Sequence, residues 1–265
     1  MRRNSIFWGL AAILVGVVLL LNTLGLLPGN AWTYIWGFFL ILLGLWFLIS
    51  PRLFQHSQAE AETLTLPLDG AHRAEIRIHH GAGELNLSAL ANSSDLLSGR
   101  FVGGVRHKEH YHSDRVTVKL EPFSEVFIPP AIPPSPGLSW DLALSRAVEL
   151  QLELHTGASS SNLDLRDLRV TYLRLETGAS ATVLDLPVNA GHTRFEAETG
   201  AASLEVHVPQ GVAARIEVES GLAGVNVDLA RFPSNGRFYQ SGDYETAANR
   251  VEMRIQTGVG SVDIR

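Results

Sequence analysis

A short phrase centred on a glycine recurs six times along the chain and constrains its fold more than any other feature. Each copy alternates apolar and polar residues up to the glycine and has a small or apolar residue after it, as in the ELHTGAS stretch around Gly157. The central glycines from Gly157 to Gly221 are spaced 21, 22 and 21 residues apart. Fixed periods of this size are typical of stacked-coil architectures. The six central glycines are Gly81, Gly157, Gly178, Gly200, Gly221 and Gly258.

The apolar positions of each copy predict a strand that bends at its glycine. Residues three and five before the glycine are apolar in every copy, and so is the residue six after it. These two sets are an odd number of residues apart, so a straight strand could not bury both on one face. Glycine tolerates the positive φ or the close approach that such a corner needs. We therefore expect an all-β repeat domain over residues 64–265, a β-solenoid whose neighbouring repeats stack, with an antiparallel β-sandwich as the alternative.

Two longer segments interrupt the repeats, at about residues 91–145 and 231–250. The first contains two stretches, residues 100–105 and 116–120, that predict a β-hairpin, and then six of the 12 prolines of the chain between residues 122 and 136. Because proline cannot donate a ladder hydrogen bond, this stretch favours a surface loop or spacer, with a partner-binding ligand as the alternative. The second segment is typical of a hairpin or capping loop before the final repeat.

The first 50 residues contain no Asp, Glu or Lys and predict a membrane segment. Residues 6–27 and 31–50 are uncharged runs, each long enough to cross a bilayer as a helix. The Pro-Gly-Asn break at residues 28–30 leaves room only for a tight turn, so we expect a transmembrane hairpin followed by a juxtamembrane linker at residues 51–63. A signal peptide is the alternative, but the first run is too long, lacks an Ala-x-Ala-like cleavage site and is followed at once by a second span.

The two predicted spans repeat each other, with paired glycines at the same offset. Glycines seven residues apart lie on one face of a helix and allow close backbone approach. Packing within the hairpin is the favoured interpretation, and a dimer interface is the alternative. No ionisable residue lies inside either span, which argues against a proton relay, an ion path or a transporter site. The paired glycines are Gly9 and Gly16 in the first span and Gly37 and Gly44 in the second.

Charge is distributed unevenly along the chain. Arg2 and Arg3 give the first 50 residues a net charge of +2, while the remainder has 19 basic and 27 acidic residues, or −8, for a total of −6. The predicted hairpin is flanked on one side by Arg2, Arg3 and Arg52. The positive-inside rule therefore predicts that both termini and the β-domain are cytoplasmic. The lack of a basic face excludes a typical nucleic-acid binder. The lack of cysteine excludes disulfides, thiolate metal sites and cysteine nucleophiles.

The sequence shows no catalytic constellation. No Gly-x-Ser-x-Gly elbow occurs, and the Gly-Ala-Gly stretch that begins at Gly81 lacks the spacing and the following helix of a phosphate-binding loop. His107, His110 and His112 are the best metal-ligand candidates, although in a strand His107 would point away from the other two. A solvated polar hairpin is the favoured interpretation of these histidines, and we expect no cofactor.

Stacking in register would bring equivalent charged residues of successive coils to about 5 Å from one another. The resulting acidic ladders would repel internally and would favour a cation such as Ca²⁺ or a basic partner segment. The favoured alternative is a solvated outer face whose counterions are the nearby Arg174, Arg194 and Arg215. The ladder residues are Asp164, Asp185, His207 and Asp228, seven after the glycine, and His155, Glu176, Glu198 and Glu219, two before it.

The doubled Trp-Gly…Gly pattern of the hairpin resembles the N-terminal region of LiaF-type bacterial membrane proteins. The repeats look like the toastrack β-domain of such proteins, as do the YQSGDY stretch from Tyr239 and the terminal GVGSVDI stretch from Gly258. The resemblance covers nearly the whole chain. It implies a right-handed, solenoid-like β-domain tethered to the cytoplasmic membrane, and it brings no catalytic residues.

The resemblance also implies a role in cell-envelope stress signalling, in which a LiaF-type protein restrains a sensor kinase. We therefore expect a non-enzymatic, membrane-anchored regulatory protein that acts through protein contacts of its β-domain. The expected partners are the lipid bilayer and a sensor histidine kinase or another membrane protein. Further copies of the chain, in a homo-oligomer, are an additional candidate partner. The alternative is a structural envelope scaffold or a self-assembling β-surface. An enzyme acting on polysaccharide ranks third, because no catalytic constellation is evident.

Overall fold

The computed structural model describes residues 61–91, 94–123 and 138–265. The predicted transmembrane hairpin with its glycines, most of the linker and most of the proline-rich stretch lie outside these residues. The described part is all-β, and it contains no helix long and apolar enough to cross a membrane. Its strands are β1 (Ala61–Pro67), β2 (Arg73–Ala89), β3 (Asp95–Val102), β4 (Val105–His112), β5 (Arg115–Pro122), β6 (Leu138–Leu144), β7 (Glu149–Asp164), β8 (Arg169–Asp185), β9 (His192–His207), β10 (Ala213–Val227), β11 (Ser234–Asn235), β12 (Phe238–Gln240) and β13 (Arg250–Ile264).

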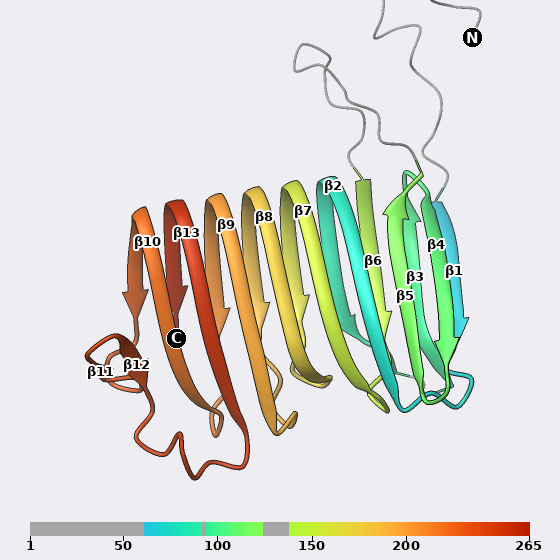
Figure 1. Cartoon of the computed structure of the whole chain (residues 1–265). Coiled ribbons are helices and arrows are strands. Elements are labelled where there is room, and N and C mark those ends of the chain that lie inside the picture. Colours follow the sequence, from blue (N-terminus) through green and yellow to red (C-terminus); the bar gives the residue numbers. More distant parts are fainter. Residues whose placement is uncertain (1–60, 92–93, 124–137) are drawn as a thin grey trace, which may run out of the picture. The chain divides into compact units, whose positions relative to one another are not determined.

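Six long strands, each built around one of the central glycines, form a continuous stack (Figure 1). They pair in parallel in the order β2-β7-β8-β9-β13-β10. Equivalent repeat positions lie side by side, so Leu152 of β7 is next to Leu173 of β8, which is next to Phe195 of β9. This is the β-solenoid-like fold that the repeat predicts. The parallel pairing is not that of the antiparallel sandwich.

Each long strand turns over at its glycine, so its two halves lie in two layers with the core between them (Figure 1). In β7 every second residue is buried up to Thr156, and after the turn the buried set resumes at Ser159. The inward-facing positions therefore change parity at Gly157. This change matches the odd spacing of the two apolar sets in the sequence.

Close approach of neighbouring coils, and not backbone conformation, requires glycine at these corners. None of the six corner glycines has φ in the left-handed region. A methyl group on Gly178 would lie 2.9 Å from the carbonyl oxygen of Gly157, and one on Gly200 would lie 2.7 Å from that of Gly178. The same contact joins Gly258 to Gly200 and Gly221 to Gly258. The column of glycines therefore lets the coils stack at normal strand spacing.

The stacking order departs from the chain order near its end. Neighbouring repeats stack from β7 to β9 as predicted, but β13 lies between β9 and β10 and pairs with both from Arg250 to Ile264. Between β10 and β13 the chain forms the short hairpin β11–β12, which pairs with β10 at Arg215 and Ile216. The prediction of sequential stacking was therefore wrong for the last two repeats. The buried positions of the two repeats are equivalent, so the sequence pattern does not distinguish between the two orders.

The strands of the first interrupting segment extend both layers beyond β2. β5 pairs with the first half of β2 and with β4, whereas β6 pairs with the second half of β2 and with β3, which also pairs with β1. The predicted hairpin of residues 100–105 with 116–120 was wrong. A turn at Gly103 and Gly104, both with positive φ, separates β3 from β4, and β4 is the strand that pairs with β5.

Candidate functional site: a groove along the corner glycines

A groove with a volume of about 1160 Å³ runs along the corner of the stack, across all six long strands. Each coil contributes its corner glycine and the two residues before it. At the β2 end the groove is completed by Arg106, Glu121 and Pro122 of the β4–β5 hairpin. The groove is thus built by repetition of one turn.

The residues two positions before each corner glycine form a single polar row along this groove, which we call the corner row. The sequence predicted an uninterrupted ladder of Glu176, Glu198 and Glu219. Because β13 lies between β9 and β10, Gln256 separates Glu198 from Glu219, and the ladder is interrupted there. In spatial order the corner row is His79, His155, Glu176, Glu198, Gln256 and Glu219.

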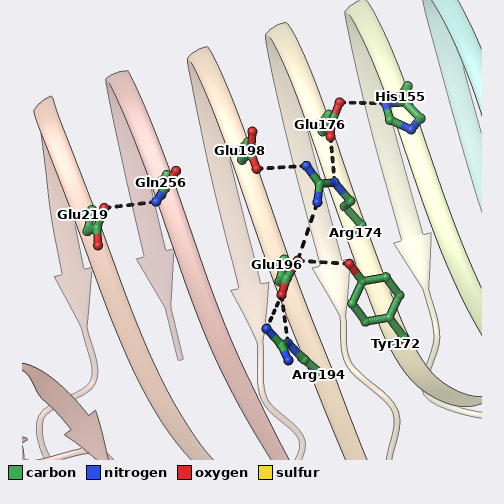
Figure 2. A network of polar contacts seen from close by, with 9 residues as sticks. All are labelled: His155, Tyr172, Arg174, Glu176, Arg194, Glu196, Glu198, Glu219 and Gln256. Atoms are coloured by element: carbon green, nitrogen blue, oxygen red, sulfur yellow. Dashed lines mark hydrogen bonds and ion pairs between the residues drawn. The ribbon is translucent and has the colours of Figure 1, made fainter.

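Arg174 links the central part of the corner row (Figure 2). Its Nε lies 2.6 Å from Glu176 Oε1 on the same strand, and its Nη2 donates a 3.0 Å hydrogen bond to Glu198 on the next coil. Its Nη1 lies 3.8 Å from Glu196. On the other side, Glu176 Oε2 lies 2.8 Å from His155 Nδ1. Two adjacent carboxylates therefore share one guanidinium, which offsets their mutual repulsion.

A second set of contacts supports this network from below the corner row (Figure 2). Tyr172 donates a 3.0 Å hydrogen bond to Glu196, and Arg194 binds the other oxygen of the same carboxylate. Partial burial raises the pKa of Glu196, but these hydrogen bonds outweigh it and hold the pKa below its ordinary value. For Glu176, burial is likewise outweighed by Arg174 and His155, which lower its pKa. Both carboxylates are therefore charged at neutral pH.

We expect Arg174→Gln to raise the pKa of Glu176, because two neighbouring carboxylates then lose their shared cation. The Arg174 side chain is 34% exposed, so solvent screening should limit the loss of unfolding free energy to at most about 1 kcal/mol. NMR titration of the carboxyl carbons measures the first effect, and thermal unfolding measures the second. Arg194→Gln is the matched control, since that side chain contacts Glu196 and not Glu176. An unchanged pKa of Glu176 in the Arg174→Gln variant would contradict the proposed network of contacts.

The β2 end of the groove has histidines where the other coils have mostly Glu and Thr. The rings of His79 and His155 stack with their centroids 4.8 Å apart. Burial and the neighbouring His155 lower the pKa of His79. His80 is only 2% exposed, and its ring packs edge-on against Trp140 with centroids 5.2 Å apart. Sequence reasoning missed His80, although the signal was present: four other copies have Thr at this position.

His80 should make the stability of the domain depend on pH. Burial lowers its pKa to about 4, whereas the unfolded chain binds a proton near the ordinary value of about 6.5. The contribution of a neutral His80 is therefore complete above pH 6.5 and is lost as the pH falls from 6.5 to 4, by on the order of 2–3 kcal/mol. His80→Thr should flatten this slope in denaturant unfolding, and the exposed control His192→Thr should not. If the unfolding free energy of the wild type and of His80→Thr depended equally on pH, His80 would not be the cause of the pH dependence.

A second row lies at the strand ends, seven residues after the corner glycines. His207 Nδ1 lies 2.9 Å from Asp185 Oδ1, and Arg166 binds both oxygens of Asp164 at 2.9 and 2.7 Å. The sequence predicted a mainly acidic ladder, but β13 inserts Arg265 between His207 and Asp228, so the row carries both signs. Binding of Ca²⁺ or of a basic segment by either row stays a prediction. In spatial order this row is Asp164, Asp185, His207, Arg265 and Asp228.

The three metal-ligand candidates, His107, His110 and His112, all lie on the exposed part of β4. They are opposite Leu120, Thr117 and Arg115 of β5 in the antiparallel pairing. Strand alternation places His110 and His112 on one face and His107 on the other. In the part of the chain that the structure describes, no group of three or more His, Asp or Glu side chains could hold a metal ion.

Two protein-family models match the sequence. The LiaF transmembrane domain matches residues 7–59. The N-terminal domain of toast_rack (DUF2154) matches residues 55–207, which is more than half of the chain. The chain belongs to the toast_rack family. This toast_rack protein is LiaF-like, with an N-terminal transmembrane region followed by a toast_rack domain, as the resemblance indicated.

Two solved structures match the chain. The structure of a candidate cell adhesion protein from Clostridium sporogenes ATCC 15579 matches with a TM-score of 0.71 and 20% identity, over 77% of this chain and 98% of that one. A candidate adhesin from Bacteroides fragilis NCTC 9343 matches with a TM-score of 0.30 and 5% identity, over 78% of this chain and 97% of that one. The first likeness shows the fold alone. No curated protein matches this toast_rack sequence.

Proposed function

We propose that this toast_rack protein is a non-enzymatic regulatory protein that modulates a cell-envelope stress response through protein contacts of its β-domain. The observation that carries this proposal is the succession of a LiaF transmembrane domain and a toast_rack domain in one chain. Neither matched family is an enzyme family. The proposed partner is a membrane-bound sensor histidine kinase, in line with the role that the LiaF resemblance implies.

The corner groove is the contact surface that we propose. Parallel pairing on both sides of each inner coil holds the corner row at a regular spacing, and Glu198 and Glu219 are exposed along it. A basic segment of a partner fits this surface best, because it would pair with these carboxylates. Among the described residues of the groove, His155 is hydrogen-bonded to Glu176, and neither ring nitrogen of His80 has a hydrogen-bond partner. Neither histidine therefore forms a nucleophile–base pair with a serine or threonine hydroxyl.

Photocrosslinking from the membrane tests this proposal. A photoreactive amino acid placed at Glu198 in the groove should capture a sensor histidine kinase. Ser160 is the matched control position, because it is exposed on the second half of β7 and does not line the groove. Capture of the same kinase from both positions would argue against the groove as the contact surface. Capture of no kinase from either position would argue against the signalling role.

We also propose the arrangement of the membrane region. Two helices, at residues 6–27 and 31–50, form a hairpin that a linker at residues 51–63 joins to the β-domain, with both termini and the β-domain in the cytoplasm. The match to a LiaF transmembrane domain and the flanking arginines support this arrangement. A reporter fused after Arg265 should be active only if it is of a kind that works in the cytoplasm. Activity of a periplasmic reporter at this position would overturn the orientation.

The alternative function is a structural scaffold of the envelope, or a self-assembling β-surface with no signalling role. The observation in its favour is that the Clostridium sporogenes protein with this fold is described as a candidate cell adhesion protein. The photocrosslinking experiment separates the two functions. Adducts of this chain with copies of itself alone would favour the scaffold.

A further inference from the structure

The two ends of the stack are finished differently. In the layer formed by the first halves of the long strands, the outermost strand beyond β2 is β4, which carries Arg106, Lys108 and Glu109. In the layer formed by the second halves, which we call the second layer, the outermost strand is β1, which carries Glu62 and ends at Pro67. Charged edge strands of this kind prevent the addition of further strands. At the other end the outermost long strand is β10, which the short β12 covers only at Arg215 and Ile216.

The second half of β10, residues 222–227, is an open edge. It pairs with β13 on one side, and no described strand pairs with its other side. It contains no charged residue. The Leu222 side chain is 84% exposed and lies beside Val259, which is 53% exposed. Val225 is only partly buried, although the equivalent residue is buried in every other coil.

We propose that this edge binds the same edge of a second copy of the chain. Antiparallel pairing about a two-fold axis would continue the second layer from one copy into the other. With the axis perpendicular to that layer, Leu222 of both copies lies on the outer face and Val225 of both copies lies on the core side. The unpaired main-chain groups then gain hydrogen-bond partners, and the apolar side chains lose contact with water.

Charge favours a second copy over other occupants of this edge. Addition of the β1 edge of a neighbouring molecule, which ends the same layer, would place Glu62 against a segment that has no charge to pair with it, at a cost in desolvation, and Pro67 could not donate a ladder hydrogen bond. A basic segment would find no carboxylate along residues 222–227. The uncharged edge is therefore complementary to itself. The inference does not rest on the proposed function, because it uses the open edge of β10 and not the corner row.

A single introduced cysteine can report on this contact, because the chain contains none of its own. Gly224 lies in the middle of the edge, and no atom within 4 Å would obstruct a side chain there. In the purified full chain in nanodiscs, we expect Gly224→Cys to form a disulfide-linked dimer under mild oxidation. Ser160→Cys is the matched control, because it is exposed in the interior of the same layer and should stay unlinked.

Adding Leu222→Lys to Gly224→Cys should lower the yield of linked dimer at least tenfold, because a lysine blocks an edge. The high exposure of Leu222 means that the fold should tolerate this change, and a circular dichroism melt checks that it does. Phe123→Lys, which replaces another exposed apolar residue at the other end of the stack, should leave the yield unchanged. The proposal is overturned by either of two results: no linkage through position 224, or linkage that Leu222→Lys does not lower.

Discussion

Two truncated chains, one lacking residues 250–265 and the other lacking residues 208–265, are expected to melt at the same temperature, well below the intact protein. β13 pairs with both β9 and β10 along its whole length, so its removal leaves β10 with no long neighbour. Burial of its apolar side chains contributes about 1.5–3 kcal/mol each, and their loss is on the order of 10 kcal/mol, comparable with the stability of a whole domain. These side chains are Val251, Met253, Ile255, Val262 and Ile264.

Circular dichroism melting of both truncated chains and the intact chain in the same detergent measures this effect. Without β13, the retained residues 208–249 should add nothing to the stability of the coils from β2 to β9. A clearly higher melting temperature for the longer truncated chain would contradict this expectation. It would mean that β10 had moved into the place of β13 beside β9.

Gly200→Ala is the second change with a large expected effect, a loss of about 2 kcal/mol, or roughly 4–8 °C in Tm for a domain of this size. The new methyl group would lie 2.7 Å from the carbonyl oxygen of Gly178. That oxygen belongs to backbone that the pairing of β8 with β9 holds in place on both sides of the corner. The coils therefore cannot separate locally without breaking ladder hydrogen bonds.

Gly224→Ala is the matched control for this substitution. Gly224 also lies in a long strand, β10, three residues after the corner glycine Gly221. A methyl group at Gly224 would meet no atom within 4 Å. Alanine restricts the unfolded chain more than glycine does, so the stability should be unchanged or rise by up to about 1 kcal/mol. Thermal melts of both variants check the comparison. Equal losses would show that the glycine column does not limit how closely the coils stack.

The repeated strand and its corner could be predicted from the sequence, because both depend on residues close together in the chain. The parity change around Gly157 is readable within one copy. The order of the coils is not readable in this way. Ile216 of β10 and Met253 of β13 occupy the same buried repeat position, so the sequence pattern does not distinguish which of the two strands lies next to Phe195 of β9.

The candidate site was predictable to the same extent. The spacing to the corner glycines correctly placed Glu176 beside Glu198. The sequence placed Arg174 among the counterions of the ladder, and the structure confirms this. The sharing of Arg174 by two coils was not predictable, because its side chain reaches across to the next coil as well as along its own strand. The interruption by Gln256 depends on the strand order and could not be foreseen without it. The groove itself is a property of the folded corner, and no single repeat contains it.

The position of β13 has a consequence for how this protein is made. β10 leaves the ribosome before β13 does, yet the place beside β9 belongs to β13. β10 is therefore available to pair with the edge of β9 before its native neighbour, β13, has been synthesised. The native stack forms only if β10 waits unpaired or if β13 later displaces it, and either route delays completion of the fold. During the interval between the emergence of the two strands, the edges of β9 and β10 lack their native neighbour, which exposes the nascent chain to mispairing and aggregation.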